Sequence, residues 1–129
     1  MLKTSKAFSG FAVKDILKAR QFYADTLGLD VKTNEDMLAI DLGSGAKVLI
    51  YPKPDHTPAT YTILNFPVEN VERTVRALKE RGVRFEIYKN ADYGTDDEGI
   101  HRGPNEPTVA WFTDPSGNIL SVVEGTGLR

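Results

Sequence analysis

The feature that most constrains this chain is an internal repeat of one short plan. The stretch FAVKD at residues 11–15 recurs 55 residues later as FPVEN at 66–70, each time closing an apolar run and preceding a helical pattern. The glycines of two tight turns, Gly45 and Gly117, lie 72 residues apart. The second copy therefore carries 17 additional residues, which fall between its helix and its last hairpin.

Each copy predicts the order strand, helix, strand, strand, strand. Asp15 and Asn70 are suitable N-caps for helices over 16–27 and 71–81, and a glycine follows the end of each helix. Apolar and β-branched runs bounded by turn residues predict the strands. These are expected over 7–13, 29–33, 37–42, 47–52, 60–68, 83–88, 108–113 and 118–124.

Composition excludes several classes of function. The chain has no cysteine, so it can form neither a disulfide nor a thiolate metal site. Its net charge of −2 and its scattered basic residues argue against nucleic acid as a partner. No signal peptide or membrane span is evident, so we expect no membrane association and a cytoplasmic protein.

Three stretches together resemble the vicinal oxygen chelate superfamily, which includes glyoxalase I, extradiol dioxygenases and the fosfomycin- and bleomycin-resistance proteins. They are FAVKDILKARQFYADTLGL, LNFPVENVERTVRALKERGV and FTDPSGNILSVVE. The resemblance implies an α+β fold of two βαβββ modules, at about 6–53 and 60–125, in a single domain over residues 1–129. The mixed sheets would curl into a shared cup with the helices outside, and homodimers are expected.

In many members of this superfamily a divalent metal lies in the cup, held by His, Gln or Glu. The resemblance maps the four ligand positions onto Phe8, Leu49, Ile63 and Ser121. Three of these side chains are apolar and the fourth is an alcohol, whereas a metal site needs several nitrogen or oxygen ligands. We therefore expect no metal and no cofactor, and the sequence identifies no catalytic residue.

Strand alternation predicts which side chains face the cup. Period-two alternation places Tyr51, Tyr61, Asn65 and Trp111 on the cup face, together with Ser121. An aromatic wall with a few polar groups suits a partly apolar small molecule. We expect Ser121 to be either a small wall residue or a hydrogen-bond donor to the ligand.

The additional residues of the second copy predict a lid over 89–106. This segment contains His101 and Arg102 between glycines, and Arg102 could clamp an anionic group of a ligand. His101 is a candidate ligand contact, whereas a surface location is the simpler interpretation for His56. The acidic residues between 92 and 98 lack the spacing of a calcium loop and are interpreted as solvated.

These features favour a metal-free protein that binds a small molecule, resembling the antibiotic-sequestering bleomycin-resistance branch. The expected ligand has an aromatic body and an anionic or oxygen-rich end. One alternative is a glyoxalase- or dioxygenase-like enzyme, a lyase or oxidoreductase, whose metal ligands come from other positions. A second alternative is a protein-interaction module in which the cup is vestigial.

Overall fold

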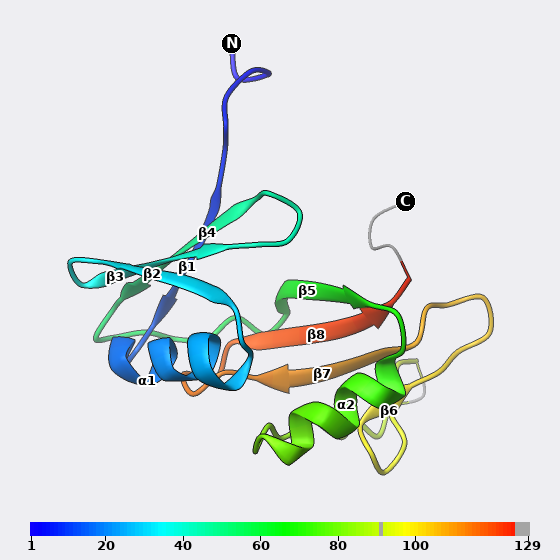
Figure 1. Cartoon of the computed structure of the whole chain (residues 1–129). Coiled ribbons are helices and arrows are strands. Elements are labelled where there is room, and N and C mark those ends of the chain that lie inside the picture. The colour runs from blue at the N-terminus through cyan, green and yellow to red at the C-terminus, as the bar shows by residue number, and fades with distance from the viewer. Residues whose placement is uncertain (91, 126–129) are drawn as a thin grey trace. The chain divides into compact units, whose positions relative to one another are not determined.

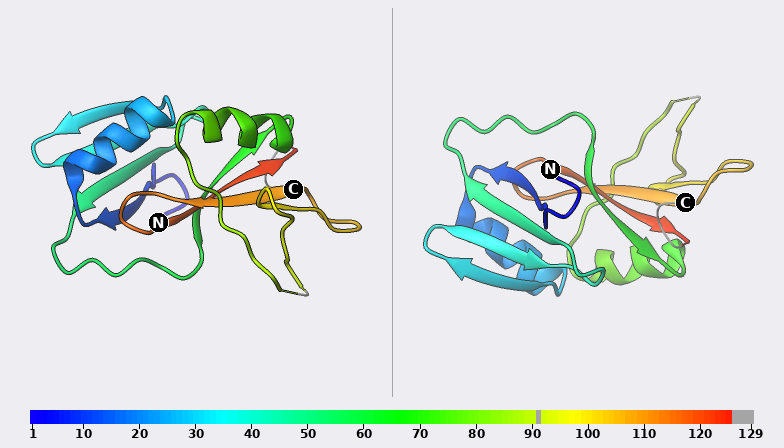
Figure 2. Two further views of the ribbon diagram at one scale, coloured as in Figure 1. Left: turned by 90° about the horizontal axis from the view of Figure 1, so that it is seen from below. Right: turned by 90° about the horizontal axis from the view of Figure 1, so that it is seen from above.

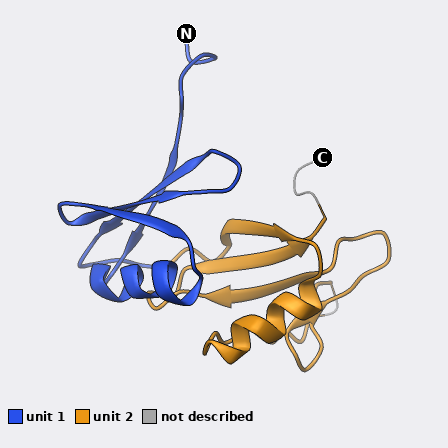
Figure 3. Ribbon diagram, in the orientation of Figure 1, with its two compact units in different colours: residues 1–57 blue, residues 58–129 orange. Residues whose placement is uncertain are grey.

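A computed structural model describes residues 1–90 and 92–125 of the chain. The chain forms two compact units, Met1–Thr57 and Pro58–Arg129 (Figure 3). Each unit has one four-stranded mixed sheet and the element order strand, helix, strand, strand, strand (Figure 1). The expected α+β class and βαβββ order are therefore confirmed.

The first unit contains the sheet order β1-β4-β3-β2. Strand β1 pairs in parallel with β4, and the other neighbours are antiparallel. Val48 and Ile50 of β4 are buried, while Lys47 and Tyr51 on the alternate face are exposed. The strands are β1 (Ser9–Val13), β2 (Asp30–Asn34), β3 (Met37–Asp41) and β4 (Lys47–Pro52).

The helix of the first unit begins as predicted but is not a single α-helix. Asp15 caps α1 (Ile16–Arg20) by accepting hydrogen bonds from the amides of Leu17 and Lys18, each at 3.1 Å. The chain then continues as a π-helix, η1 (Gln21–Thr26), whose wider turn no local propensity in the sequence predicts. Tyr23, in η1, is fully buried.

The second unit contains the sheet order β5-β8-β7-β6, with β5 parallel to β8. Helix α2 packs against β7 and β8 and lies along one face of the sheet (Figure 2). Asn70 caps the helix as predicted, accepting from the amide of Arg73 at 2.9 Å. The elements are β5 (Thr62–Val68), α2 (Val71–Glu80), β6 (Ile100–His101), β7 (Val109–Thr113) and β8 (Ile119–Glu124).

The prediction of a strand over 83–88 is wrong, and what forms there instead shows where the additional residues lie in the sheet. Only an isolated bridge between Phe85 and Phe112 forms there, with one further hydrogen bond from the Glu86 amide to the Trp111 carbonyl at 2.8 Å. The edge of the sheet is completed instead by β6, where Ile100 pairs with Ala110. The additional residues therefore interrupt an edge strand of the sheet instead of following it.

Residues 87–99, here called the insertion, contain part of the additional length, and the two sides of this segment are hydrogen-bonded to each other. The amide of Thr95 donates to the Tyr88 carbonyl at 2.8 Å, and the Tyr88 amide donates to the Thr95 hydroxyl at 2.9 Å. Gly99 has a φ of +91°, and a Cβ there would lie 2.8 Å from the Cβ of Phe85. Gly99 thus permits a close approach of the chain to Phe85, which explains a glycine at this position.

Candidate functional site

The register of the second sheet brings three predicted residues side by side. Asn65 of β5 pairs with Ser121 of β8, which pairs with Trp111 of β7. Their neighbours in the chain, Leu120 and Phe112, are buried on the opposite face. Alternation therefore assigns one face of this sheet to the core under α2 and the other to a candidate site.

A cavity of about 290 Å³ lies on that second face. Its floor comes from the sheet and its rim from β6 and the two loops that flank β6. This volume suits a molecule of one or two rings, near the lower end of ordinary ligand pockets. The lining residues are Asn65, Tyr93, His101, Glu106, Pro107, Val109, Trp111 and Val123.

Ser121 contributes to the pocket indirectly, by a hydrogen bond to the Asn65 side chain. Its side chain is fully buried, and its hydroxyl donates to Oδ1 of Asn65 at 2.5 Å. This contact occupies the acceptor of the Asn65 amide and leaves its Nδ2 group as a hydrogen-bond donor at the pocket. A serine at this position therefore orients an amide on the pocket wall.

The aromatic part of the wall is a connected cluster. The Trp111 ring lies 5.5 Å from that of Tyr88 and 6.4 Å from that of Tyr93, both in edge-to-face geometry. Burial raises the pKa of Tyr88, and the Glu86 carboxylate adds to this effect. Tyr93 comes from the insertion, so the insertion supplies one side of the pocket.

His101 joins two loops at the rim. Its Nδ1 lies 2.9 Å from the carbonyl oxygen of Gly94, and its Nε2 lies 2.8 Å from Oε2 of Glu106. The imidazole is buried, which disfavours its charged form. The hydrogen bond with Glu106 and the one with Gly94 nevertheless raise the pKa of His101 above its ordinary value of 6.5.

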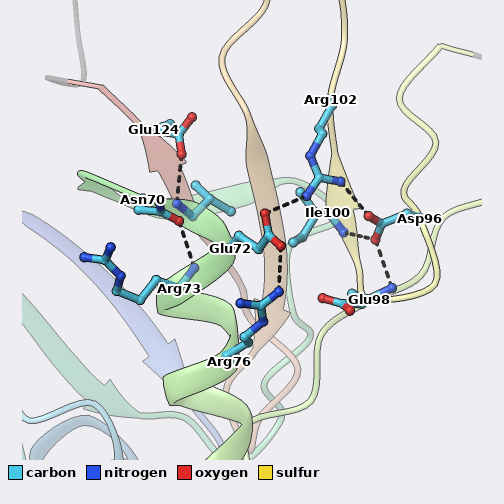
Figure 4. A network of polar contacts seen from close by, with 10 residues as sticks. Asn70, Glu72, Arg73, Arg76, Asp96, Glu98, Ile100, Arg102 and Glu124 are labelled. Atoms are coloured by element: carbon cyan, nitrogen blue, oxygen red, sulfur yellow. Dashed lines mark hydrogen bonds and ion pairs between the residues drawn. The ribbon is translucent and has the colours of Figure 1, made fainter.

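Arg102, predicted to clamp an anionic ligand, is engaged elsewhere. Its guanidinium pairs with Asp96 at 2.6 Å and with Glu72 of α2 at 3.4 Å (Figure 4). Asp96 also accepts from the amides of Ile100 and Glu98. Burial acts to raise the pKa of Asp96, but the hydrogen bonds from Ile100 and Arg102 outweigh it, so the pKa lies below its ordinary value. Arg102 and Asp96 therefore fasten the insertion to α2, and Arg102 does not line the pocket.

The two predicted tyrosines lie outside this pocket. Tyr51 belongs to β4 of the first unit, and Tyr61 precedes β5 and is 69% exposed. A bulge between Thr62 and Leu64 makes Thr62 the partner of Ile119, so the alternation that placed Tyr61 on the cup face does not extend to it.

Several lining residues were absent from the predicted site. Val109 and Val123 follow the same alternation as Trp111 and Ser121 and could have been included on that ground. Tyr93 and Glu106 lie within the predicted lid, but their loops have no periodicity, so the sequence does not single out these two side chains.

The four positions that the family implies for a metal do not fit one. The side chains of Phe8, Leu49 and Ile63 contain no nitrogen or oxygen, and the hydroxyl of Ser121 is bonded to Asn65. Across residues 1–90 and 92–125, no group of three or more His, Cys, Asp or Glu side chains could hold a metal ion.

In the same residues, no helix combines the length and apolar character that crossing a bilayer requires.

Comparison with solved structures identifies the fold. The fosfomycin resistance protein FosX from Listeria monocytogenes superposes with a TM-score of 0.70 at 16% identity, covering 94% of this chain and 93% of that one. Lactoylglutathione lyase from Agrobacterium tumefaciens superposes with a TM-score of 0.67 at 19% identity, covering 95% and 96%. At these identities the likeness concerns the fold alone.

Comparison at the level of sequence identifies the family. No curated protein matches the chain. The family model for the Glyoxalase/Bleomycin resistance protein/Dioxygenase superfamily matches residues 7–122, which run from before β1 into β8. The chain belongs to the Glyoxalase/Bleomycin resistance protein/Dioxygenase superfamily.

Proposed function

We propose that the second unit binds a small organic molecule in this pocket without a metal, and that the protein sequesters or carries that molecule. The observation that carries the proposal is the Asn65 amide, whose oxygen accepts from Ser121 and whose Nδ2 remains as a donor in the pocket that Trp111 also lines. The ligand would have an apolar or aromatic body against Trp111 and Tyr93. An oxygen acceptor of the ligand would receive the hydrogen bond from Nδ2.

A binding role fits the polar groups of the pocket better than an enzymatic one. General acid–base catalysis requires a side chain that can exchange a proton with the substrate. The titratable side chains of His101 and Glu106 lie at the rim, and they contact each other through Nε2 and Oε2 at 2.8 Å. Both nitrogens of His101 are bonded within the protein. The arrangement therefore supports binding by burial and hydrogen bonding.

Ligands can be sought through the single tryptophan of the chain, because Trp111 lines the pocket. Compounds of one or two rings that carry a carbonyl or carboxylate oxygen should change its emission, and calorimetry then gives their affinity. Chelation with EDTA should leave that affinity unchanged. A binding reaction that requires added metal would contradict the proposal.

Asn65→Asp tests the role of the amide. The aspartate keeps an acceptor for Ser121 but removes the Nδ2 donor, so an oxygen-bearing ligand should bind about tenfold more weakly. Asn34→Asp on strand β2 makes the same change of charge at an exposed position and should not alter affinity. Equal affinities for the wild type and Asn65→Asp would remove the proposed contact.

The homodimer and the cytoplasmic location expected from the sequence remain part of the proposal. Phe8 and Tyr61 support an interface with a second copy, because each precedes an edge strand and they are 65% and 69% exposed. Light scattering at micromolar concentration should give twice the mass of one chain. A mass of one chain at all concentrations would contradict the dimer.

A further inference from the structure

His101 is the point at which two loops meet over the pocket. One is the insertion, which supplies the carbonyl of Gly94, and the other is residues 102–108, which supply Glu106. The His101 side chain is 10% exposed and the Glu106 side chain is 54% exposed. Glu106 and the adjacent Pro107 both line the pocket. The contact at Nε2 therefore determines where one rim of the pocket lies.

Both contacts of the ring require a donor on the histidine. A backbone carbonyl only accepts, and an ionised carboxylate only accepts. A neutral imidazole carries one N–H group, whereas the imidazolium carries two. With Glu106 as a carboxylate, the contacts with Gly94 and Glu106 can therefore exist together only when His101 is protonated. Loss of the proton must break one of them.

The contact that breaks is the one with Glu106. The neutral ring can keep its proton on Nδ1 and continue to donate to the Gly94 carbonyl. The half-exposed Glu106 carboxylate can then turn into water, which hydrates it at little cost. Glu106 would otherwise face an imidazole lone pair at 2.8 Å. Residues 102–108 would lose this tie to β6.

We propose that protonated His101 is a latch that holds residues 102–108 against the pocket, and that deprotonation opens this rim. His101 is thus a positioning residue for the binding site. The use of the latch in ligand exchange rests on the proposed function, whereas its existence does not.

Among the charged groups around His101, Glu106 is the one that faces the imidazole, so the proposed switch consists of His101 and Glu106. From residues 102–108 the facing charge is Glu106, and from β7 the neighbour is the uncharged Trp111 ring, 6.1 Å away and tilted by 45°. Arg102, the next residue in the chain, is neutralised by Asp96 and Glu72. From the insertion the polar contact is the uncharged Gly94 carbonyl.

The sign of the pH dependence follows from the direction of the pKa shift. The hydrogen bond with Glu106 is the main cause of the raised pKa of His101. The stabilisation is fully present below the unfolded value of 6.5 and is lost as the pH rises through the folded pKa. The latch is therefore closed in mildly acidic solution and opens toward alkaline pH.

The test needs no ligand. The chain has two histidines, so NMR of the protein labelled with ¹⁵N-histidine, compared with His56→Gln, assigns the His101 titration. Acrylamide quenching of Trp111 fluorescence reports access to the pocket over the same pH range. We expect a His101 pKa above 6.5 and a loss of protection from acrylamide as the pH passes through it.

Glu106→Gln separates a latch from a general structural contact. The glutamine amide can accept from the imidazolium or donate to the neutral ring, so its contact with Nε2 survives deprotonation. Quenching should then become independent of pH, and the His101 pKa should fall toward 6.5. Glu98→Gln removes an equal charge from the exposed insertion and should titrate as the wild type does.

A His101 pKa at or below 6.5 would overturn the latch, as would unchanged pH-dependent quenching in Glu106→Gln. Titration as expected without any compound that binds would leave the latch in place and reject the proposed function. If a compound binds but acrylamide quenching in the wild type does not change with pH, the proposed function stands and the latch is rejected.

Discussion

Replacing Phe112 by alanine should lower the free energy of unfolding by about 3–5 kcal/mol, the usual cost of emptying a buried aromatic site. Phe112 is 1% exposed and lies 5.4 Å, ring to ring, from Phe85. It also forms the bridge that holds Phe85 beside β7. The variant therefore loses core packing under α2 and the ring contact with Phe85, while the backbone bridge remains possible.

Trp111→Ala is the matched control, because Trp111 directly precedes Phe112 in β7 and lines the pocket. It should cost less stability than Phe112→Ala but remove the aromatic wall of the site. Urea unfolding followed by circular dichroism measures both variants, including the one that lacks tryptophan. Equal losses of stability would show that the two faces of β7 do not differ as described.

Asp114→Ala should cost about 3 kcal/mol through the loss of several hydrogen bonds to one buried carboxylate. Asp114 is 4% exposed. Its Oδ1 accepts from the amides of Ser116 and Asn118 at 2.9 and 3.0 Å, and its Oδ2 accepts from the Asn118 side chain at 2.9 Å. The variant would leave the amides of Ser116 and Asn118 and the Asn118 side chain without this acceptor, in the turn between β7 and β8.

Asp114→Asn should be intermediate, because it keeps an acceptor for the two amides but places an NH₂ group opposite Nδ2 of Asn118. Urea unfolding should rank the wild type first, Asp114→Asn second and Asp114→Ala last. If the asparagine and alanine variants unfold together, the retained acceptor contributes nothing and this account of the turn fails.

Local features of the sequence predicted most of the elements. Asp15 and Asn70 cap their helices as expected, because a cap depends on amides two or three residues away. Gly45 and Gly117 occupy positive-φ positions in their turns, as their patterns indicate. Alternation along β7 and β8 assigned Trp111 and Ser121 to one face because period two is a property of each strand alone.

The pocket itself was determined by contacts between distant residues. Ser121 orients an amide 56 positions away, and Arg102 pairs with Glu72, 30 positions away. A bulge in β5 changes which residue faces the pocket, and the position of the insertion inside the sheet edge brings Tyr93 to the rim. None of these relations leaves a periodic trace in the chain.

The sequence by itself determined two βαβββ units, their caps and turns, and the lack of side chains suited to a metal at the four family positions. Those depend on residue type and on interactions within a few positions. Only the tertiary structure decided that Arg102 forms ion pairs with Glu72 of α2 and Asp96 of the insertion, while His101 and Glu106 pair at the pocket rim. Such pairings depend on strand register and loop path, which are fixed by the packing of the whole unit.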